Sequence, residues 1–150
     1  MEIRIMNRKA SFNYEAIEKF EAGIMLTGSE VKSIRASEVS IGEGFCIFKG
    51  DELFVKNMHI APYKEAGNLS NHEPLRLRKL LLHRKQLNKL IKGIETKGVT
   101  IIPYKLYTTK SGIIKLEIWL SRGKKNFDKK NSIKEKDLDR ETSRIIKNNE

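Results

Sequence analysis

The sequence predicts a mainly β protein, in which short antiparallel strands form a compact barrel with a helix or two inserted. Two observations carry this prediction. β-Branched and aromatic runs alternate with glycine-containing turns, and only two segments have clear helical periodicity. Five or six such strands bury their apolar faces most simply by closing on one another. Small oligonucleotide-binding (OB-like) barrels have this architecture and present an open sheet face to nucleic acid.

The first predicted hairpin joins residues 45–49 to residues 53–60. Gly50 and Asp51 stand between them, and a glycine at the first turn position suits a type II′ turn. Further along, residues 75–78 read Leu-Arg-Leu-Arg, a strict alternation that is typical of a half-buried strand.

The second predicted hairpin joins residues 99–108 to residues 113–120 through a turn at Ser111 and Gly112. Pro103 marks an edge or a bulge in its first strand, because proline has no amide proton for a ladder hydrogen bond. In the second strand one face is apolar, and the other carries Lys115, Glu117 and Trp119.

Two segments favour helices. Thr27 and Glu30 have capping-box spacing, which opens a short helix that runs through Arg35. The other segment ends before Gly98 and has apolar residues at i, i+3, i+4 and i+7: Leu87, Leu90, Ile91 and Ile94. Residues 14–26 are ambiguous, since near-helical spacing of apolar side chains competes with a glycine followed by a strand-like run.

The chain is basic throughout, and its apolar content divides it into a body and a tail. Thirty Lys and Arg against 19 Asp and Glu give a net charge of +11, which favours a polyanionic partner such as RNA. Residues 1–123 form the predicted domain, and residues 124–150 have too few apolar residues to fold alone. Within this tail Ser132 and Glu135 form a capping box, and a basic stripe follows on the helix it would open: Lys136, Arg140, Arg144 and Lys147. We expect the tail to be disordered alone and helical against RNA.

Catalytic and metal-binding signals are weak. His59, His72 and His83 lack metal-site spacing, so we expect structural or surface roles and no metal or cofactor. Nucleotide-binding glycine loops and nucleophile elbows are missing, which argues against an enzyme. The one cysteine, Cys46, lies in an apolar run and is expected to be buried. No segment approaches the roughly 20 apolar residues of a membrane span, so a cytoplasmic protein without membrane contact is expected.

Several motifs, in order along nearly the whole chain, resemble the SmpB family, whose members bind transfer-messenger RNA (tmRNA, or SsrA RNA) in ribosome rescue. They are Asn7-Arg8-Lys9-Ala10, Phe20-Glu21-Ala22-Gly23-Ile24, residues 28–35, Arg78-Lys79-Leu80-Leu81-Leu82, residues 98–103 and Gly123-Lys124-Lys125-x-x-Asp128-Lys129-Lys130. The resemblance implies an OB-like barrel in which residues 14–26 are mostly extended. It also implies that the barrel binds the elbow of the tRNA-like domain of tmRNA.

The RNA-binding residues that we predict combine this resemblance with the basic clusters of the body. The resemblance implies Glu21, Leu81 and Lys115, and the clusters supply Asn7, Arg8, Lys9, Lys32, Arg35, Arg78 and Lys79. Lysine and arginine position phosphates, a leucine packs on an unstacked base, and a carboxylate accepts from base amino groups.

The resemblance further implies that the tail occupies the decoding centre and the empty mRNA channel of the small ribosomal subunit, where it substitutes for codon–anticodon pairing. The tail residues assigned to this role are Lys124, Lys125, Phe127, Asp128, Lys129, Lys130, Lys136, Arg140 and Arg144. Lys130, Phe127 and Leu138 depart from the usual family pattern of Arg, His or Tyr, and Trp. Implied partners are elongation factor Tu with alanyl-tmRNA and, indirectly, alanyl-tRNA synthetase.

Two alternatives remain open from the sequence. One is a general RNA-binding barrel, such as a ribosomal protein or an RNA chaperone, which would bind many RNAs with similar affinity. The other is an RNA-processing or peptidyl-tRNA-hydrolysing enzyme, which would show turnover as a purified protein.

Overall fold

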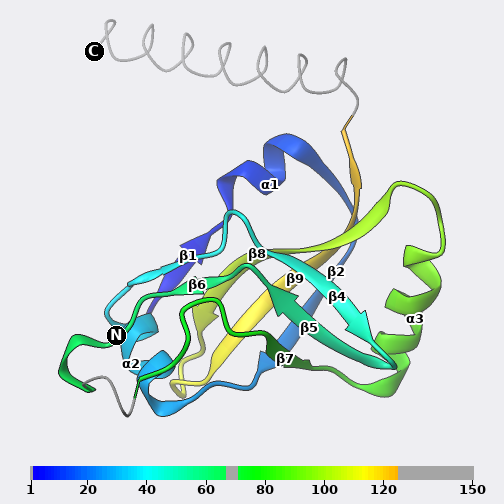
Figure 1. The fold of residues 1–150 in the computed structure, drawn as a ribbon. Helices are drawn as coiled ribbons and strands as arrows, with labels where there is room; N and C mark the ends of the chain where they lie inside the picture. Colours follow the sequence, from blue (N-terminus) through cyan, green and yellow to red (C-terminus); the bar gives the residue numbers. More distant parts are fainter. Residues whose placement is uncertain (1, 67–70, 125–150) are drawn as a thin grey trace, which may run out of the picture.

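The computed structural model describes residues 2–66 and 71–124 (Figure 1). In chain order the elements are β1 (Arg4–Met6), α1 (Arg8–Asn13), β2 (Tyr14–Ile24), α2 (Gly28–Arg35), β3 (Val39–Ser40), β4 (Phe45–Lys49), β5 (Glu52–Lys56), β6 (His59–Ile60), the 3-10 turn η1 (Lys64–Ala66), β7 (Arg78–Leu81), α3 (Arg84–Ile94), β8 (Val99–Thr108) and β9 (Ile114–Gly123). The chain is therefore mainly β, with antiparallel pairing throughout the described strands.

The main sheet closes on itself. Its strands follow the order β1-β8-β4-β5-β7-β2-β9, and β9 also pairs with β8. Six strands of the described chain therefore form a ring, while β1 adds to β8, and β3 pairs with β6 in a small separate sheet. Closure leaves few unpaired strand edges, the usual solution for a short antiparallel sheet.

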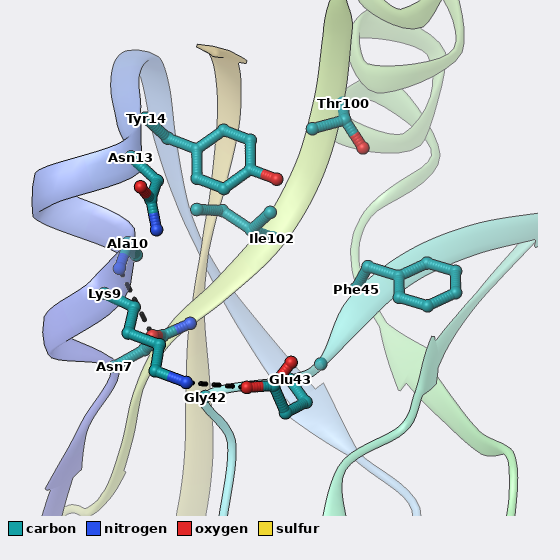
Figure 2. A pocket seen from close by; sticks show the side chains of 11 residues that line it. Asn7, Lys9, Ala10, Asn13, Tyr14, Gly42, Glu43, Phe45, Thr100 and Ile102 are labelled. Atoms are coloured by element: carbon teal, nitrogen blue, oxygen red, sulfur yellow. Dashed lines mark hydrogen bonds and ion pairs between the residues drawn. The ribbon is translucent and has the colours of Figure 1, made fainter. Parts of the chain in front are cut away.

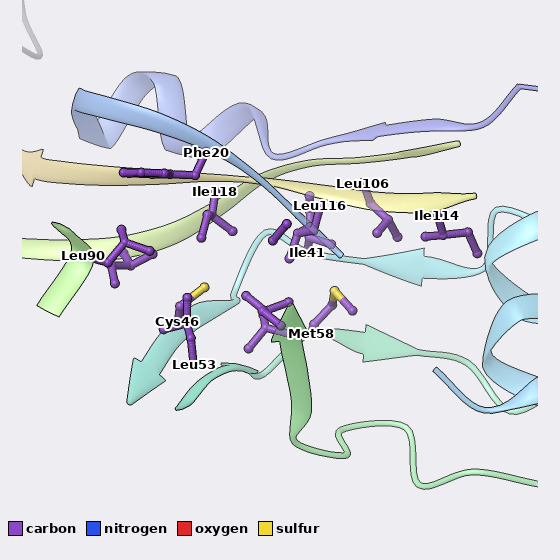
Figure 3. Packing of buried hydrophobic residues seen from close by; sticks show 14 of the residues in the cluster. Phe20, Ile41, Cys46, Leu53, Met58, Leu90, Leu106, Ile114, Leu116 and Ile118 are labelled. Atoms are coloured by element: carbon purple, nitrogen blue, oxygen red, sulfur yellow. The ribbon is translucent and has the colours of Figure 1, made fainter. Parts of the chain in front are cut away.

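The core lies inside the ring (Figure 3). Alternation along β9 sends Leu116 and Ile118 inward, where their cross-strand partners on β2 are Ala22 and Phe20. Cys46 on β4 is also buried there, and burial raises the pKa of its thiol. The thiol thus packs as a small apolar group, as the sequence predicted.

A second apolar cluster lies outside the ring, beneath α1. Trp119 points away from the main core, stacks on Tyr104 with ring centroids 4.0 Å apart, and packs with Ala10 of α1 and Ile102. The register of β8 against β9 shifts between Pro103 and Lys105, which confirms the predicted bulge and accommodates Tyr104.

Several sequence predictions match the observed elements. The capping box of Thr27 and Glu30 opens α2, and α3 covers the predicted apolar periodicity. The hairpin between β4 and β5 turns at Gly50, whose φ of +63° fits the first position of a type II′ turn. The ambiguous segment is extended as β2 through Ile24, as the resemblance implied.

Three predictions need correction. The alternating strand at residues 75–78 begins instead at Arg78, because β7 has to pair with β2 and β5. The strand at residues 53–60 is interrupted at Asn57, whose φ of +60° separates β5 from β6. Helix α1 was not predicted, although Asn7 caps it by accepting from the Ala10 amide.

Candidate nucleic-acid interface

A surface hollow of about 530 Å³ lies where β2, β7 and β9 meet the start of α3. Its lining comes from four elements and the β7–α3 connection: Glu21, Gly23, Leu81, Leu82, His83, Gln86 and Lys115. The hollow therefore unites Glu21, Leu81 and Lys115, residues that are as many as 94 positions apart in the sequence.

Strand register explains this convergence. Gly23 is the cross-strand partner of both Leu81 on β7 and Lys115 on β9, so these side chains flank it on the outer face. A Cβ at Gly23 would lie 3.2 Å from the Leu81 Cβ, tighter than ordinary contact. Because glycine has no Cβ, the Leu81 side chain can pack beside this position of β2 and line the hollow.

The hollow offers three different kinds of contact. Leu81 is 49% exposed and presents an apolar surface, the exposed Glu21 carries a carboxylate, and Lys115 supplies an ammonium group. Tyr107 on β8 donates a hydrogen bond from its hydroxyl to Oε2 of Glu21. An apolar surface in the same hollow as an acceptor and a cation suits an unpaired nucleotide, whose base stacks while its edge and phosphate bind polar groups.

Two residues of the predicted RNA-binding set are buried and hold the fold instead. Arg78 is fully buried, donates from Nε to Oε2 of Glu30, and donates from Nη1 to the Met58 carbonyl over 2.7 Å. Asn7 is 4% exposed, and its amide donates to the Pro103 carbonyl over 2.9 Å. Sequence reasoning placed both at the surface because polar residue type does not reveal burial. We therefore leave them out of the interface.

Apart from Lys115, the other predicted basic residues of the body do not line the hollow. Lys79 lies two residues before Leu81 on the same side of β7, with its ammonium 3.3 Å from a Glu52 carboxylate oxygen. The remaining four are exposed and lie on α1 or α2: Arg8, Lys9, Lys32 and Arg35.

Of these, Lys9 borders a different hollow, of about 480 Å³ (Figure 2). Lys9 makes a 2.7 Å ion pair with Glu43 at its side, and the rings of Tyr14 and Phe45 form parts of its wall. Both Lys9 and Glu43 are largely exposed, so this pair adds little to stability. The structure thus separates the Asn7-Arg8-Lys9 motif from the hollow that contains Glu21.

Three residues near Glu21 were not in the predicted RNA-binding set. His83, the N-cap residue of α3, and Gln86 in its first turn line the hollow, and the Gln86 carboxamide accepts from the His83 amide over 3.1 Å. Tyr107 reaches the hollow through its bond to Glu21. The sequence placed Tyr107 in the predicted strand 99–108, but a contact across β9 depends on the register of three strands.

The tail begins against α1. The Lys124 amide donates to the Asn13 carbonyl over 2.8 Å, and its ammonium donates to the Ser11 carbonyl over 2.9 Å. The other tail residues assigned to the ribosome lie outside the described residues: Lys125, Phe127, Asp128, Lys129, Lys130, Lys136, Arg140 and Arg144.

His72 has a structural role. Its Nδ1 lies 2.8 Å from the Ser29 hydroxyl oxygen, and its Nε2 lies 2.9 Å from the Ile60 carbonyl oxygen, so it ties α2 to β6. Within residues 2–66 and 71–124 there is no cluster of three or more possible metal ligands. No helix in this part of the chain is long and apolar enough to cross a membrane.

Comparisons with known proteins identify relatives over nearly the full length. The family model described as SmpB protein matches residues 4–148. The SsrA-binding protein of Cytophaga hutchinsonii is 50% identical over 143 residues, covering 95% of this chain and 93% of its own. The SsrA-binding protein of Wolbachia pipientis wMel is 48% identical and covers 99% of each chain.

A solved structure agrees with these relatives. It is described as "tmRNA-SmpB: a journey to the center of the bacterial ribosome", and one of its chains matches with a TM-score of 0.69 and 44% identity. The match covers 82% of this chain and 85% of that one. On this evidence the chain belongs to the SmpB family.

Proposed function

We propose that this protein binds the tRNA-like domain of tmRNA, delivers it to stalled ribosomes and acts in trans-translation. The observation that carries the proposal is the hollow that unites Glu21, Leu81 and Lys115 on one face. The names of its relatives support it, since they are SsrA-binding proteins and SsrA RNA is tmRNA. The net charge of +11 supports a polyanionic partner.

Each of these three side chains would contact a different part of the RNA. Leu81 packs on an unstacked base of the RNA elbow, because half of its surface is available. Lys115 binds a phosphate, and Glu21 accepts from a base amino or imino group. The protein thus acts by binding, without covalent chemistry of its own.

The ring of strands would serve as an OB-like barrel that carries this face. The tail would fold in the decoding centre and the mRNA channel, replacing the missing codon–anticodon pairing. Elongation factor Tu and alanyl-tmRNA would share the delivery complex, and alanyl-tRNA synthetase would contribute by charging the RNA. These events belong to the cytoplasm.

The proposal is tested by comparing the full chain with a chain that ends at Lys124. Truncation after Lys124 retains the two hydrogen bonds that join it to α1, and the buried core residues of the described chain all precede it. Each protein is titrated with the tRNA-like domain and with ordinary tRNA at about 150 mM salt, which suppresses non-specific phosphate binding. Alanine transfer on stalled ribosomes is measured in parallel.

We expect both proteins to bind the tRNA-like domain selectively and only the full chain to support alanine transfer. Equal affinity for the two RNAs would point to a general RNA-binding barrel. Loss of selectivity on truncation would place recognition in the tail and contradict the assignment of the hollow.

A further inference from the structure

The Glu21 side chain would need a fixed orientation to recognise a base. It is exposed on the outer face of β2, and an exposed glutamate normally samples many rotamers. A bound base would have to select one of them, which costs affinity. In this structure Glu21 is already held, because the Tyr107 hydroxyl donates to its Oε2.

Tyr107 is anchored by its surroundings. It is half-buried on β8, and the Lys105 ammonium lies 5.0 Å from its ring centroid. Lys105 also lies 3.8 Å from a Glu117 carboxylate oxygen, and Glu117 accepts from the indole N–H of the buried Trp119 over 3.0 Å. A chain of contacts therefore links the packed cluster under α1 to the exposed carboxylate.

The geometry of this chain leaves Glu21 able to bind a ligand. Tyr107 uses one carboxylate oxygen, so the other remains as an acceptor beside Leu81 and Lys115. Burial, followed by the bond to Glu21, raises the pKa of the Tyr107 hydroxyl, which keeps it protonated as a donor at neutral pH.

We propose that Tyr107 is a positioning residue, which orients the Glu21 carboxylate for RNA recognition without touching the RNA. This inference rests on the proposed function, because it assigns a partner to the carboxylate of the same hollow. Tyr107→Phe removes the hydroxyl and keeps the ring that packs beside Lys105. The loss of one hydrogen bond of this kind should weaken binding of the tRNA-like domain about three- to tenfold.

The test is a double-mutant cycle on the affinity of the full chain for the tRNA-like domain. It uses the wild type, Tyr107→Phe, Glu21→Ala and the double variant. If Tyr107 acts through Glu21, the hydroxyl loses its effect once the carboxylate is gone. Tyr107→Phe should then change affinity less than about twofold in the Glu21→Ala background. If Tyr107 had only a structural role, Tyr107→Phe would weaken RNA binding by the same factor with and without the Glu21 carboxylate.

Tyr104→Phe is the matched control, because it removes a hydroxyl from the same strand at a residue that stacks on Trp119. It should leave RNA affinity unchanged, and thermal unfolding should show that each variant folds. Wild-type affinity in Tyr107→Phe, or an equal loss in both backgrounds, would overturn the inference. Failure of the wild type to prefer the tRNA-like domain over tRNA would instead overturn the proposed function.

Discussion

At the scale of single residues, Glu30 of α2 joins the helix cap to two arginines. Its carboxylate is fully buried and accepts from the Thr27 amide, Arg76 and Arg78. Burial alone would raise the pKa, but the hydrogen bonds from Arg76, the Thr27 amide and Arg78 outweigh it and lower the pKa to about 2. One side chain therefore caps a helix and neutralises a buried guanidinium.

This arrangement predicts how stability depends on pH. Because the pKa of Glu30 is lower in the folded state, its stabilisation is present above pH 4.5 and is lost as pH falls toward 2. Glu30→Gln should lower the free energy of unfolding at pH 7 by about 3–5 kcal/mol, since Arg78 stays buried without its counter-charge. The difference in the free energy of unfolding between this variant and the wild type, measured by urea unfolding, should decrease as pH falls from 4.5 to 2.

Arg76→Ala provides the milder comparison. The Arg76 side chain is 35% exposed, and its removal leaves the pair between Arg78 and Glu30 in place. We expect a loss of about 1–2 kcal/mol at pH 7. A Glu30→Gln effect that stays constant from pH 7 to 3 would show that the charge of Glu30 is not the source of its stabilisation.

Residue type alone did not separate the roles of the basic side chains. Arg78 and Lys79 are adjacent in the sequence, yet β7 turns Arg78 into the core and Lys79 outward. The alternation at residues 75–78 suggested a strand with arginines exposed to solvent. Arg78 is buried instead, because it forms an ion pair with the buried Glu30 carboxylate. Glu21, Leu81 and Lys115 came from resemblance to a family, and strand register then brought them into one hollow.

At the scale of elements, α3 packs closely on β9 through Gly93. A Cβ at Gly93 would lie 2.5 Å from Cδ2 and 2.9 Å from Cδ1 of Leu120, a core side chain that is 5% exposed. Alanine would add about 1 kcal/mol of helix propensity, but the contact forces Leu120 or the helix to move. Gly93→Ala should therefore lower the free energy of unfolding by about 1–2 kcal/mol, measured by urea unfolding.

Gly28→Ala is the matched control for this prediction. Gly28 is the first residue of α2, and a Cβ there would meet no atom within 4 Å. That variant should be as stable as the wild type or slightly more stable. A Gly93→Ala protein that is stabilised would mean that the helix and strand have room for a methyl group.

The elements that the sequence predicted well are those whose signals are local. The hairpins turn at glycines that the structure finds at positive φ, Gly50 and Gly112, and α2 begins at its capping box. Helix α1 has only six residues, and its packing on Trp119 and Ile102 stabilises it more than its own periodicity does. Short elements of this kind depend on contacts that are distant in sequence.

At the scale of the whole molecule, the body and the tail should make separable contributions. The hollow and its charged rim lie within the described residues, whereas Lys129 and Lys130 belong to the tail that follows Lys124. Lys124 fixes the root of that tail against α1 through two bonds to carbonyls. Under the proposed function, RNA capture should therefore depend on the ring of strands, and action on the ribosome should depend on the segment that follows Lys124.

Replacing Lys129 and Lys130 together by alanine should leave the affinity for the tRNA-like domain within about twofold of wild type at ~150 mM salt, because neither residue belongs to the hollow. Alanine transfer on stalled ribosomes should be lost, since two cations are removed where rRNA phosphates are expected. Lys97→Ala with Lys134→Ala removes the same charge outside the basic stripe and outside the hollow, and is the matched control. Equal defects in both double variants would indicate dependence on charge alone, and normal transfer with the first pair would contradict the role assigned to the tail.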